Sequence, residues 1–351
     1  MKLSTRRFIF YSLVLIFILI TPPTVLYAVG YSFDWQNLSI KQTGALYLKS
    51  KPSSAKIFIN GKNNKTTPRL ISHLLPGFYQ VKISAENFHP CQKTLEIKPG
   101  LVTEARNIFL FPKNPVLELV AENASSSIEV IQNNKNLIGA NSIPPQVTTS
   151  TAAGWLLKNE NIFYLEKDTL FLWRTDLSGS IKEQLASDSL STQQNYEIKT
   201  LSGNRFLALG QDGQLFYLQK GDKTWQKISD KTNFADFSSD EKKILWIKEN
   251  ELWVKWLEDF LVQPYRQKNE QELIIRFSSP IKTAVFYPND EYLTFVVENQ
   301  IKVTELDNRD LRNIVDLIDS QDKNISIFLN SSNRYLYLKQ NNNLFRLVLN
   351  N

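Results

Sequence analysis

The stretch that decides the fold is Phe237–Val254, which reads FSSDEKKILWIKENELWV. In it a polar turn, SSDEKK, leads into the apolar strand ILWI, and a second polar turn, KENE, leads into the strand LWV. The same succession returns at Phe286–Val303 and at Leu329–Leu347. These segments indicate that the C-terminal two thirds of the chain consist of repeated β-units.

The spacing of the units predicts a β-propeller. The second strand of each unit begins at Ile128, Leu170, Leu215, Leu252, Ile301 and Leu344, at intervals of 42, 45, 37, 49 and 43 residues. A period of about 43 residues leaves room for four short strands, which is typical of a propeller blade. A single blade cannot bury both of its faces, so the units must stack around an axis.

We therefore predict a β-propeller-like domain over residues 113–351 with about six blades. The units resemble WD40-like and TolB-type propeller repeats, although no Gly-His or Trp-Asp signature recurs. Five blades, seven blades or two stacked sandwiches remain open alternatives. A β-solenoid is disfavoured because the units are too long.

The N-terminus combines a cationic cluster with a long apolar run. Three basic residues lie within the first seven positions, and Phe8–Gly30 contains no charged side chain. A helix of this length covers the roughly 30 Å hydrocarbon layer of a membrane, and its positive flank should stay in the cytoplasm. The run predicts a cytoplasmic N-terminus (1–7), a single-pass transmembrane anchor (8–30) in the cell membrane, and an extracytoplasmic remainder.

A cleaved secretory signal is the alternative to a retained anchor. Thr21–Thr24 contains two prolines that could end the helix, and Ala28 offers a possible cleavage point. Leu26, at the −3 position of such a site, is larger than the small residue that cleavage favours, and the apolar character resumes beyond the prolines. Either reading exports the bulk of the chain.

The charge balance excludes a nucleic-acid-binding role. The net charge is +6, with 41 Lys and Arg against 35 Asp and Glu. Three of the positive charges lie in the first seven residues, which leaves 38 against 35, or +3, in the remainder. Basic and acidic residues alternate there without a basic block, so we predict no nucleic-acid partner.

Few residues are available for metal or nucleophilic chemistry. The single cysteine, Cys91, cannot form an intramolecular disulfide, and we expect a buried thiol. The only histidines, His73 and His89, have no Cys or acidic cluster at metal-ligand spacing. We predict no catalytic, cofactor-binding or metal-ligating residues, and the sequence does not identify the binding residues.

We expect structural roles for the acidic pairs, in place of catalysis, and for the tryptophans, in place of glycan binding. Glu258–Asp259 and Asp290–Glu291 fall in predicted turns, where acidic side chains are usually solvated. Tryptophans spaced once or twice per repeat are more often core between blades than ligand platforms. The six in this region are Trp155, Trp173, Trp225, Trp246, Trp253 and Trp256. Trp253 and Trp256 should face opposite sides of their strand.

Short strands and turns fill the segment from Gly44 to Phe111. Asn60–Gly61 after an apolar run predicts a type I′ hairpin turn, and Pro76–Gly77 predicts another turn before a strand that alternates apolar and polar residues. We expect a compact antiparallel β-sandwich of about seventy residues here.

These residues resemble the PEGA domain, a small Ig-like β-sandwich found on exported envelope proteins. The resemblance is carried by Gly44, PSSA at 52–55, IFINGK at 57–62, Thr67–Pro68 and LPGFYQV at 75–81. Ser54 and Asn87 stand where the family carries Gly, but both residues are compatible with turns. The resemblance implies an extracytoplasmic binding or scaffolding module, assigned to residues 44–112 after a linker at 31–43, without catalytic residues of its own.

Together these features predict a single-pass envelope protein that binds or scaffolds without catalysis, its ligand a protein or a cell-wall polymer. The competing class is an enzyme acting on envelope glycan or peptide at the central mouth of the propeller, where loops converge. Several acidic residues within hydrogen-bond reach at that mouth would favour an enzyme, and a flat or aromatic rim would favour binding. A sensor that signals inward would need a membrane partner, since seven cytoplasmic residues are too few for an output domain.

Overall fold

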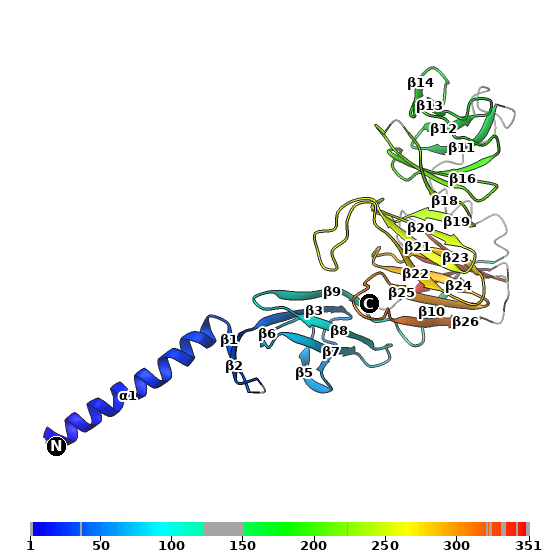
Figure 1. Cartoon of the computed structure of the whole chain (residues 1–351). Helices are drawn as coiled ribbons and strands as arrows, with labels where there is room; N and C mark the ends of the chain where they lie inside the picture. Colours follow the sequence, from blue (N-terminus) through cyan, green and yellow to red (C-terminus); the bar gives the residue numbers. More distant parts are fainter. Residues whose placement is uncertain are drawn as a thin grey trace. The chain divides into compact units, whose positions relative to one another are not determined.

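The computed structural model describes residues 3–35, 37–122, 151–222, 224–320, 322, 325–330, 335–341 and 343–348. They fall into two compact units (Figure 1). The first unit holds residues 1–113, 308–313 and 351, and the second holds 114–307 and 314–350. One helix precedes a succession of strands that covers the rest of the described residues. The predicted fold class, all-β with one N-terminal helix, is confirmed.

Helix α1 (Leu3–Ala28) is apolar around its whole circumference. Its segment Thr5–Ala28 is long and apolar enough to cross a membrane, and no protein buries it. At about 1.5 Å per residue the segment covers somewhat more than the roughly 30 Å of a hydrocarbon layer. This statement concerns length and composition only, and a signal sequence shares both.

Two prolines lie inside this helix. Pro22 and Pro23 each remove one backbone hydrogen bond, and Oγ1 of Thr24 donates to the carbonyl of Ile20 at 2.8 Å, next to the bonds that are lost. The helix nevertheless continues through both prolines to Ala28. The alternative in which Thr21–Thr24 ends the helix is therefore wrong.

A two-stranded hairpin follows the helix. Strands β1 (Tyr31–Asp34) and β2 (Ser39–Gln42) pair antiparallel, with Phe33 opposite Ile40. Asp34 holds the turn, because its carboxylate accepts a hydrogen bond from Nδ2 of Asn37 at 2.8 Å. The segment expected as a linker thus has regular structure of its own.

The next seven strands form the sandwich. Its two sheets have the orders β6-β3-β9 and β5-β4-β7-β8. The strands are β3 (Gly44–Lys51), β4 (Lys56–Ile59), β5 (Lys62–Thr66), β6 (Arg69–Leu74), β7 (Gly77–Ser84), β8 (Cys91–Ile97) and β9 (Val102–Phe109). Alternate residues of the facing strands make the core between the sheets, among them Leu46, Leu48, Ile57, Ile83 and Leu95. One pair, β3 with β9, runs parallel, so the expectation of a purely antiparallel sandwich is wrong.

Positive backbone φ angles explain the turn residues of the sandwich. Asn60 and Gly61 have φ of 49° and 78°, as the predicted type I′ turn requires. Ser54 and Asn87, the two departures from the PEGA pattern, have φ of 64° and 62°. The positions therefore keep the left-handed conformation that glycine would adopt, at a modest cost for the side chains present.

Residues 308–313 cover the edge strand β8 of the sandwich. Asp310 accepts a hydrogen bond from the backbone amide of Thr94 at 2.7 Å. The side-chain amide of Asn313 accepts from the Gln92 amide at 3.2 Å and donates to the Gln92 carbonyl at 3.1 Å. An unpaired edge strand invites pairing with other chains, and these side chains occupy part of that edge.

Within its described residues the second unit contains five four-stranded antiparallel sheets. The first four follow the chain: β11 (Ala152–Lys158), β12 (Asn161–Glu166), β13 (Leu172–Asp176) and β14 (Lys182–Gln184); β15 (Tyr196–Lys199), β16 (Arg205–Gly210), β17 (Leu215–Gln219) and β18 (Gln226–Ser229); β19 (Phe234–Phe237), β20 (Lys243–Lys248), β21 (Glu251–Trp256) and β22 (Gln271–Arg276); β23 (Ile281–Phe286), β24 (Tyr292–Val297), β25 (Gln300–Glu305) and β26 (Ile314–Asp319).

The fifth sheet joins the two ends of this unit. It has the order β10-β29-β28-β27 and combines β27 (Ser326–Leu329), β28 (Leu336–Gln340) and β29 (Asn343–Val348) with β10 (Val116–Ala121). Val116 of the first strand lies opposite Val348 of the last. A ladder of backbone hydrogen bonds thus ties the start of the unit to its end.

The repeat positions that follow from the sequence fall at equivalent places in the sheets. Leu215, Leu252, Ile301 and Leu344 lie at the start of the third strand of their sheets, and Leu170 lies just before one. The remaining position, Ile128, is outside the described residues. The part of the chain that the structure describes holds five blade-like sheets, and the expected number of about six stays a prediction.

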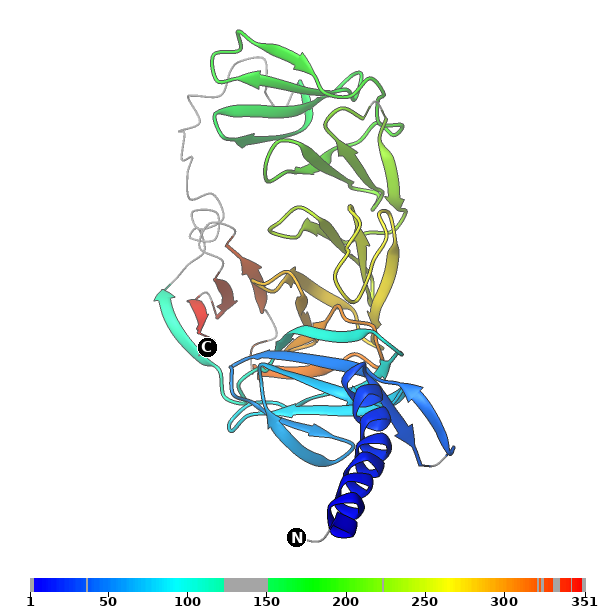
Figure 2. The same cartoon turned by 90° about the vertical axis from the view of Figure 1, so that its left-hand side faces the viewer.

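Side chains from successive sheets pack against one another. Phe163 and Leu165 meet Phe206 and Leu218 between the first two sheets, and Tyr217 meets Trp246 between the second and third. The views in Figures 1 and 2 both show the first four sheets following one another in chain order. Each middle sheet is apolar on both faces and therefore needs a neighbour on each side.

Glycine permits the closest of these approaches. A Cβ added at Gly154 of β11 would lie 2.1 Å from the carbonyl oxygen of Tyr196 in β15. No larger residue fits there without moving backbone. The short strand separation fixes how the first sheet sits against the second.

Most tryptophans of the repeats belong to the core, as expected. Trp246 is buried and stacks on Trp253 with 5.9 Å between ring centroids. Trp253 packs between the second and third sheets, and Trp256 packs between the third and fourth, so the two do face opposite sides of β21. Trp155 is the exception, with 38% of its surface exposed.

Candidate functional site

One strand from each of the five sheets lines a cavity of about 410 Å³ in the second unit. Each sheet contributes an apolar side chain to its wall: Leu156 from β11, Ile198 from β15, Phe234 from β19, Val285 from β23 and Leu329 from β27. Polar groups make up the larger part of the wall beside these apolar side chains, and binding sites are usually concave spaces that combine both kinds of group. We call this cavity the channel.

Lys199 is the best-positioned cation of the channel. Its ammonium lies 3.2 Å from the carboxylate of Glu197 and donates to the carbonyl of Ala235 at 2.9 Å. It also lies 4.3 Å from the ring centroid of Phe234, within cation–π range. Three contacts therefore fix the direction in which this charge points.

Asp236 places a carboxyl group on the same wall. Its Oδ1 accepts a hydrogen bond from the amide of Phe237 at 2.8 Å. Burial raises the pKa of this carboxyl above its ordinary value; nearby Lys199 and the Phe237 amide oppose the shift, and Glu197 adds to it. The side chain still keeps partial access to solvent, as expected of a residue that lines a narrow channel.

The raised pKa of Asp236 gives a prediction with a definite sign. The folded state holds this proton more tightly than the unfolded state, so the associated stability is full below the ordinary value of 3.8 and is lost as pH rises through the folded pKa. We expect Asp236→Asn to unfold at higher denaturant concentration than wild type at pH 7 and at the same concentration near pH 3. Urea titrations of the full chain across pH measure this.

Asp212→Asn is a control for which we expect a change in stability of the opposite sign. Burial alone would raise the pKa of Asp212, but hydrogen bonds from the Gln214 amide and from the Gln194 and Gln214 side chains outweigh it, so the pKa is lowered. Replacing this carboxylate should therefore reduce stability at pH 7. A stabilisation by both substitutions at pH 7 would contradict the assignment at Asp236.

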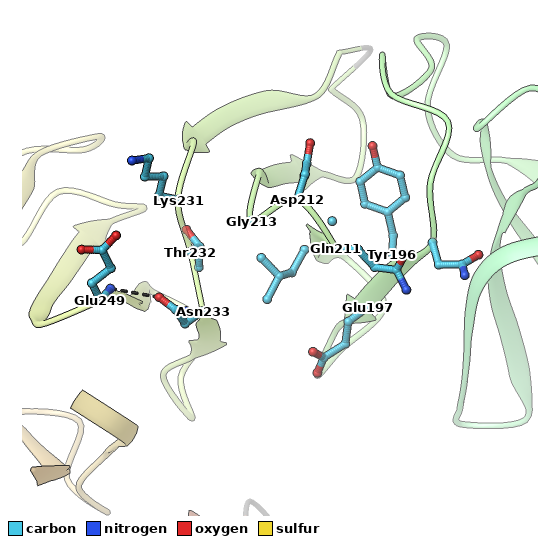
Figure 3. Close-up of a pocket in the computed structure, with 12 residues that line it drawn as sticks. Tyr196, Glu197, Gln211, Asp212, Gly213, Lys231, Thr232, Asn233 and Glu249 are labelled. Carbon is cyan, nitrogen blue, oxygen red and sulfur yellow. Dashed lines mark hydrogen bonds between the residues drawn. The ribbon is translucent and has the colours of Figure 1, made fainter. Parts of the chain in front are cut away.

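A second cleft of about 690 Å³ lies beside the second and third sheets (Figure 3). Tyr196 and Glu197 line it from β15, and the turns around Asp212 and Thr232 close it. The Glu249 amide donates to Oδ1 of Asn233 at 2.9 Å across its far wall. Glu197 lines both the cleft and the channel.

One of the three acidic residues that line the cleft, Asp212, is held within its own turn. Oδ1 of Asp212 accepts from the backbone amide of Gln214 at 3.0 Å, and its other oxygen accepts from Nε2 of Gln214 at 2.6 Å. Turn chemistry therefore explains this residue. The channel, with Lys199 and Asp236 aimed along its wall, is therefore the stronger candidate site.

The two acidic pairs from the sequence lie outside the channel. Glu258 forms ion pairs with Arg205 at 2.6 Å and Lys242 at 3.3 Å, and Asp259 accepts from the Lys268 amide at 2.7 Å. These contacts fit a structural role.

Asp290 corrects the expectation of solvated turn carboxylates. Only 3% of its surface is exposed, and it accepts hydrogen bonds from the amide and hydroxyl of Ser239 in the neighbouring sheet. The turn that carries it is pressed against the next sheet, so tertiary packing overrides the usual exposure of a turn residue. Burial likewise raises the pKa of Glu291 beside it.

Cys91 and the histidines have structural surroundings. Cys91 is buried and forms no disulfide, as expected. His73 stacks on Tyr27 with ring centroids 4.1 Å apart. Among the described residues no group of three or more His, Cys, Asp or Glu side chains is placed to hold a metal ion.

Sequence reasoning does not single out Lys199 and Asp236. The only signal is a charged residue within a short apolar strand, as in FADF at 234–237. From the sequence alone, such a residue is expected on the solvent-exposed side of a half-buried strand. Only the assembly of five sheets places that side against a shared cavity.

Comparison with known proteins matches the sandwich to a family. Residues 43–108 match the model of the PEGA domain. The resemblance inferred from its residues is confirmed for this segment. A search of curated proteins finds no match to the chain.

Several solved structures are similar at low sequence identity. A β-propeller domain from Myceliophteria thermophila aligns at 11% identity with a TM-score of 0.39, over 55% of this chain and 68% of that one. The extracellular domain of a putative one-component system from B. thetaiotaomicron aligns at 11% identity and 0.40, over 87% of this chain and 39% of that one. A functionally unknown protein from Desulfotomaculum acetoxidans aligns at 9% and 0.38, over 53% and 62%.

Proposed function

We propose that this chain is a membrane-anchored protein of the cell envelope that binds a ligand without chemical conversion, with α1 retained as the anchor and the remainder outside the cytoplasm. The charged residues before the apolar run of α1 support this orientation. The PEGA domain and the resemblance of the repeats to WD40-like and TolB-type units support a scaffolding role.

The channel is the proposed ligand site. The observation that carries this is the convergence of one strand from each of five sheets on a cavity lined by both polar and apolar groups, among them an oriented lysine. A ligand carboxylate would meet Lys199.

Polar groups of the channel are arranged for binding more than for acid–base chemistry. Glu197 is ion-paired to Lys199, and Asp236 bonds to backbone. Paired catalytic carboxylates would instead face a common reacting atom.

The test measures retention of the detergent-solubilised full chain on envelope proteins and on purified cell-wall polymer. Lys199→Ala should weaken saturable binding about tenfold, equivalent to roughly 1.4 kcal/mol. Lys182→Ala is the matched control, since Lys182 also pairs with a glutamate, Glu166, and lies over a ring, that of Trp173 at 4.1 Å, but outside the channel. Equal affinities for wild type and Lys199→Ala would reject the channel as the site.

An enzyme acting on envelope glycan or peptide is the second candidate. One observation favours it: Asp236 is a carboxyl group whose pKa is raised by burial and which lines a cavity, as general acids often do. If the retained ligand is cleaved by wild type and not by Asp236→Asn at unchanged affinity, this candidate replaces the first.

A further inference from the structure

The hairpin β1–β2 has an apolar face that the protein leaves open. Tyr31 and Phe33 of β1 lie on the same side as Ile40 of β2, because Phe33 pairs with Ile40 and alternate residues share a face. Ser32, Asp34 and Lys41 lie on the other side. Within the hairpin Ile40 is 55% exposed and Phe33 39%.

Large apolar side chains continue into the turn. Trp35 is 81% exposed and Leu38 75%. The Trp35 ring meets the Phe33 ring edge to face, with 4.8 Å between centroids. These residues, Tyr31, Phe33, Trp35, Leu38 and Ile40, form what we call the hairpin patch.

A two-stranded ribbon of this kind is marginal in water. An isolated hairpin lacks a third strand or a covering helix to bury its apolar side, and the β1–β2 sheet contains only these two strands. Leaving several large apolar side chains in water costs about 25 cal/mol for each Å² exposed. We therefore expect the apolar side chains of the hairpin patch to be shielded from water by another molecule or surface.

Polar contacts nevertheless fix the hairpin shape. The Lys41 ammonium lies 2.7 Å from the Asp34 carboxylate, and Asp34 also binds the turn through Asn37. At the open end, the amide and hydroxyl of Thr43 both donate to the carbonyl of Gly30 at 2.7 Å. The apolar side chains are thus presented by a defined scaffold.

The position of the hairpin directly after the candidate span indicates what shields the patch. The candidate span ends at Ala28 and Tyr31 begins the hairpin three residues later, a reach of about 10 Å. The interfacial layer outside the hydrocarbon core is only about 5–7 Å thick on each side. Trp and Tyr concentrate in this layer, where the ring is apolar and its polar edge stays hydrated.

The end of the helix is also tied to the sandwich. Nε2 of His73 lies 3.2 Å from the carbonyl oxygen of Tyr27, and the two rings stack. Both contacts belong to the first unit. The hairpin is held close to the point at which the helix would leave the bilayer.

We propose that the hairpin patch lies in the lipid headgroup–acyl boundary of the same membrane that α1 crosses. This inference rests on the proposed anchor. The hairpin acts as a second, shallow attachment beside the helix, and it limits rotation of the sandwich about the helix end. A zwitterionic bilayer is sufficient, because the patch contains no basic residue.

The test places an environment-sensitive fluorophore at single cysteines in the full chain, in vesicles of phosphatidylcholine that contain nitroxide-labelled lipid. Cys91→Ala removes the native thiol. Labels at Leu38→Cys and, separately, Ile40→Cys report on the patch. Ile16→Cys reports on the helix, and Lys62→Cys, on an exposed strand of the sandwich, is the water reference.

We expect a nitroxide near the headgroup to quench Leu38 and Ile40 labels about threefold more than the Lys62 label, as interfacial residues require. Quenching at Ile16 with none above the Lys62 level at either hairpin position would overturn this inference and leave the anchor intact. No quenching at Ile16 would reject the anchor itself, and the hairpin inference with it.

Discussion

Replacing Arg266 with methionine is expected to lower the free energy of unfolding of the second unit by about 3 kcal/mol. Arg266 is buried, with 7% of its surface exposed, and its guanidinium lies 2.8 Å from the carboxylates of both Glu270 and Glu272. It also lies 4.5 Å from the ring centroid of Trp256. Methionine keeps much of the volume but leaves two carboxylates facing a site without a cation.

The consequence extends to a long loop. Arg266 exchanges two backbone hydrogen bonds with Phe260, at 2.9 and 3.2 Å, and so closes the connection between β21 and β22. Leu261 and Tyr265 at the tip of that loop are 85% and 66% exposed. Loss of the guanidinium should free the loop as well as weaken the core.

Tryptophan fluorescence during urea titration of the full chain measures this, because six of the seven tryptophans, all but Trp35, lie in the second unit. Arg276→Met is the matched control. Arg276 also pairs with a glutamate, Glu251, but is 62% exposed, and an exposed pair contributes less than about 1 kcal/mol. Similar losses for the two variants would show that burial of Arg266 has no special effect.

Replacing Asp290 with alanine should cost about 2–3 kcal/mol. Its buried carboxylate accepts from the amide of Ser239 at 3.0 Å and from the hydroxyl of the same residue, which joins the turn after β23 to the turn after β19. Alanine would leave these donors without that acceptor. Asp290 also has φ of 58°, a left-handed conformation that aspartate tolerates better than alanine.

Asn289→Ala is the control for a turn residue without the cross-sheet contact. Oδ1 of Asn289 accepts only within its own turn, from the Glu291 amide at 3.0 Å, so its loss should cost about 1 kcal/mol or less. Asp290→Asn should fall between the two, because it retains an acceptor for the Ser239 amide. If Asp290→Ala unfolds no earlier than Asn289→Ala, the bond between sheets does not contribute to stability.

The sequence predicts features that depend on neighbours along the chain. The apolar run of α1, the Asn60–Gly61 turn and the spacing of Leu215, Leu252 and Ile301 all follow from local composition and periodicity. The PEGA segment is recognisable for the same reason, since its turns need particular residues at particular intervals. Substituting Ser54 and Asn87 for glycine does not hide it, because both still adopt the left-handed backbone.

Contacts between segments that are distant in the sequence cannot be predicted from local composition and periodicity. Nothing in VLELVA at 116–121 indicates that β10 will complete the sheet of β27–β29, more than 200 residues later. Asp310 and Asn313 read as ordinary turn residues, yet they bind the edge of β8. Asp290 reads as a solvated carboxylate, yet the next sheet buries it.

The sequence alone determined that the chain has an apolar N-terminal helix, a small sandwich and a repeated β-region, because periodicity and turn chemistry are local properties. Only the tertiary structure decided which polar side chains share a cavity. Lys199 and Asp236 share the channel with apolar side chains because five strands, each from a different sheet, converge there. Such convergence depends on how sheets stack, and stacking is set by the sum of many weak apolar contacts that no single stretch of sequence encodes.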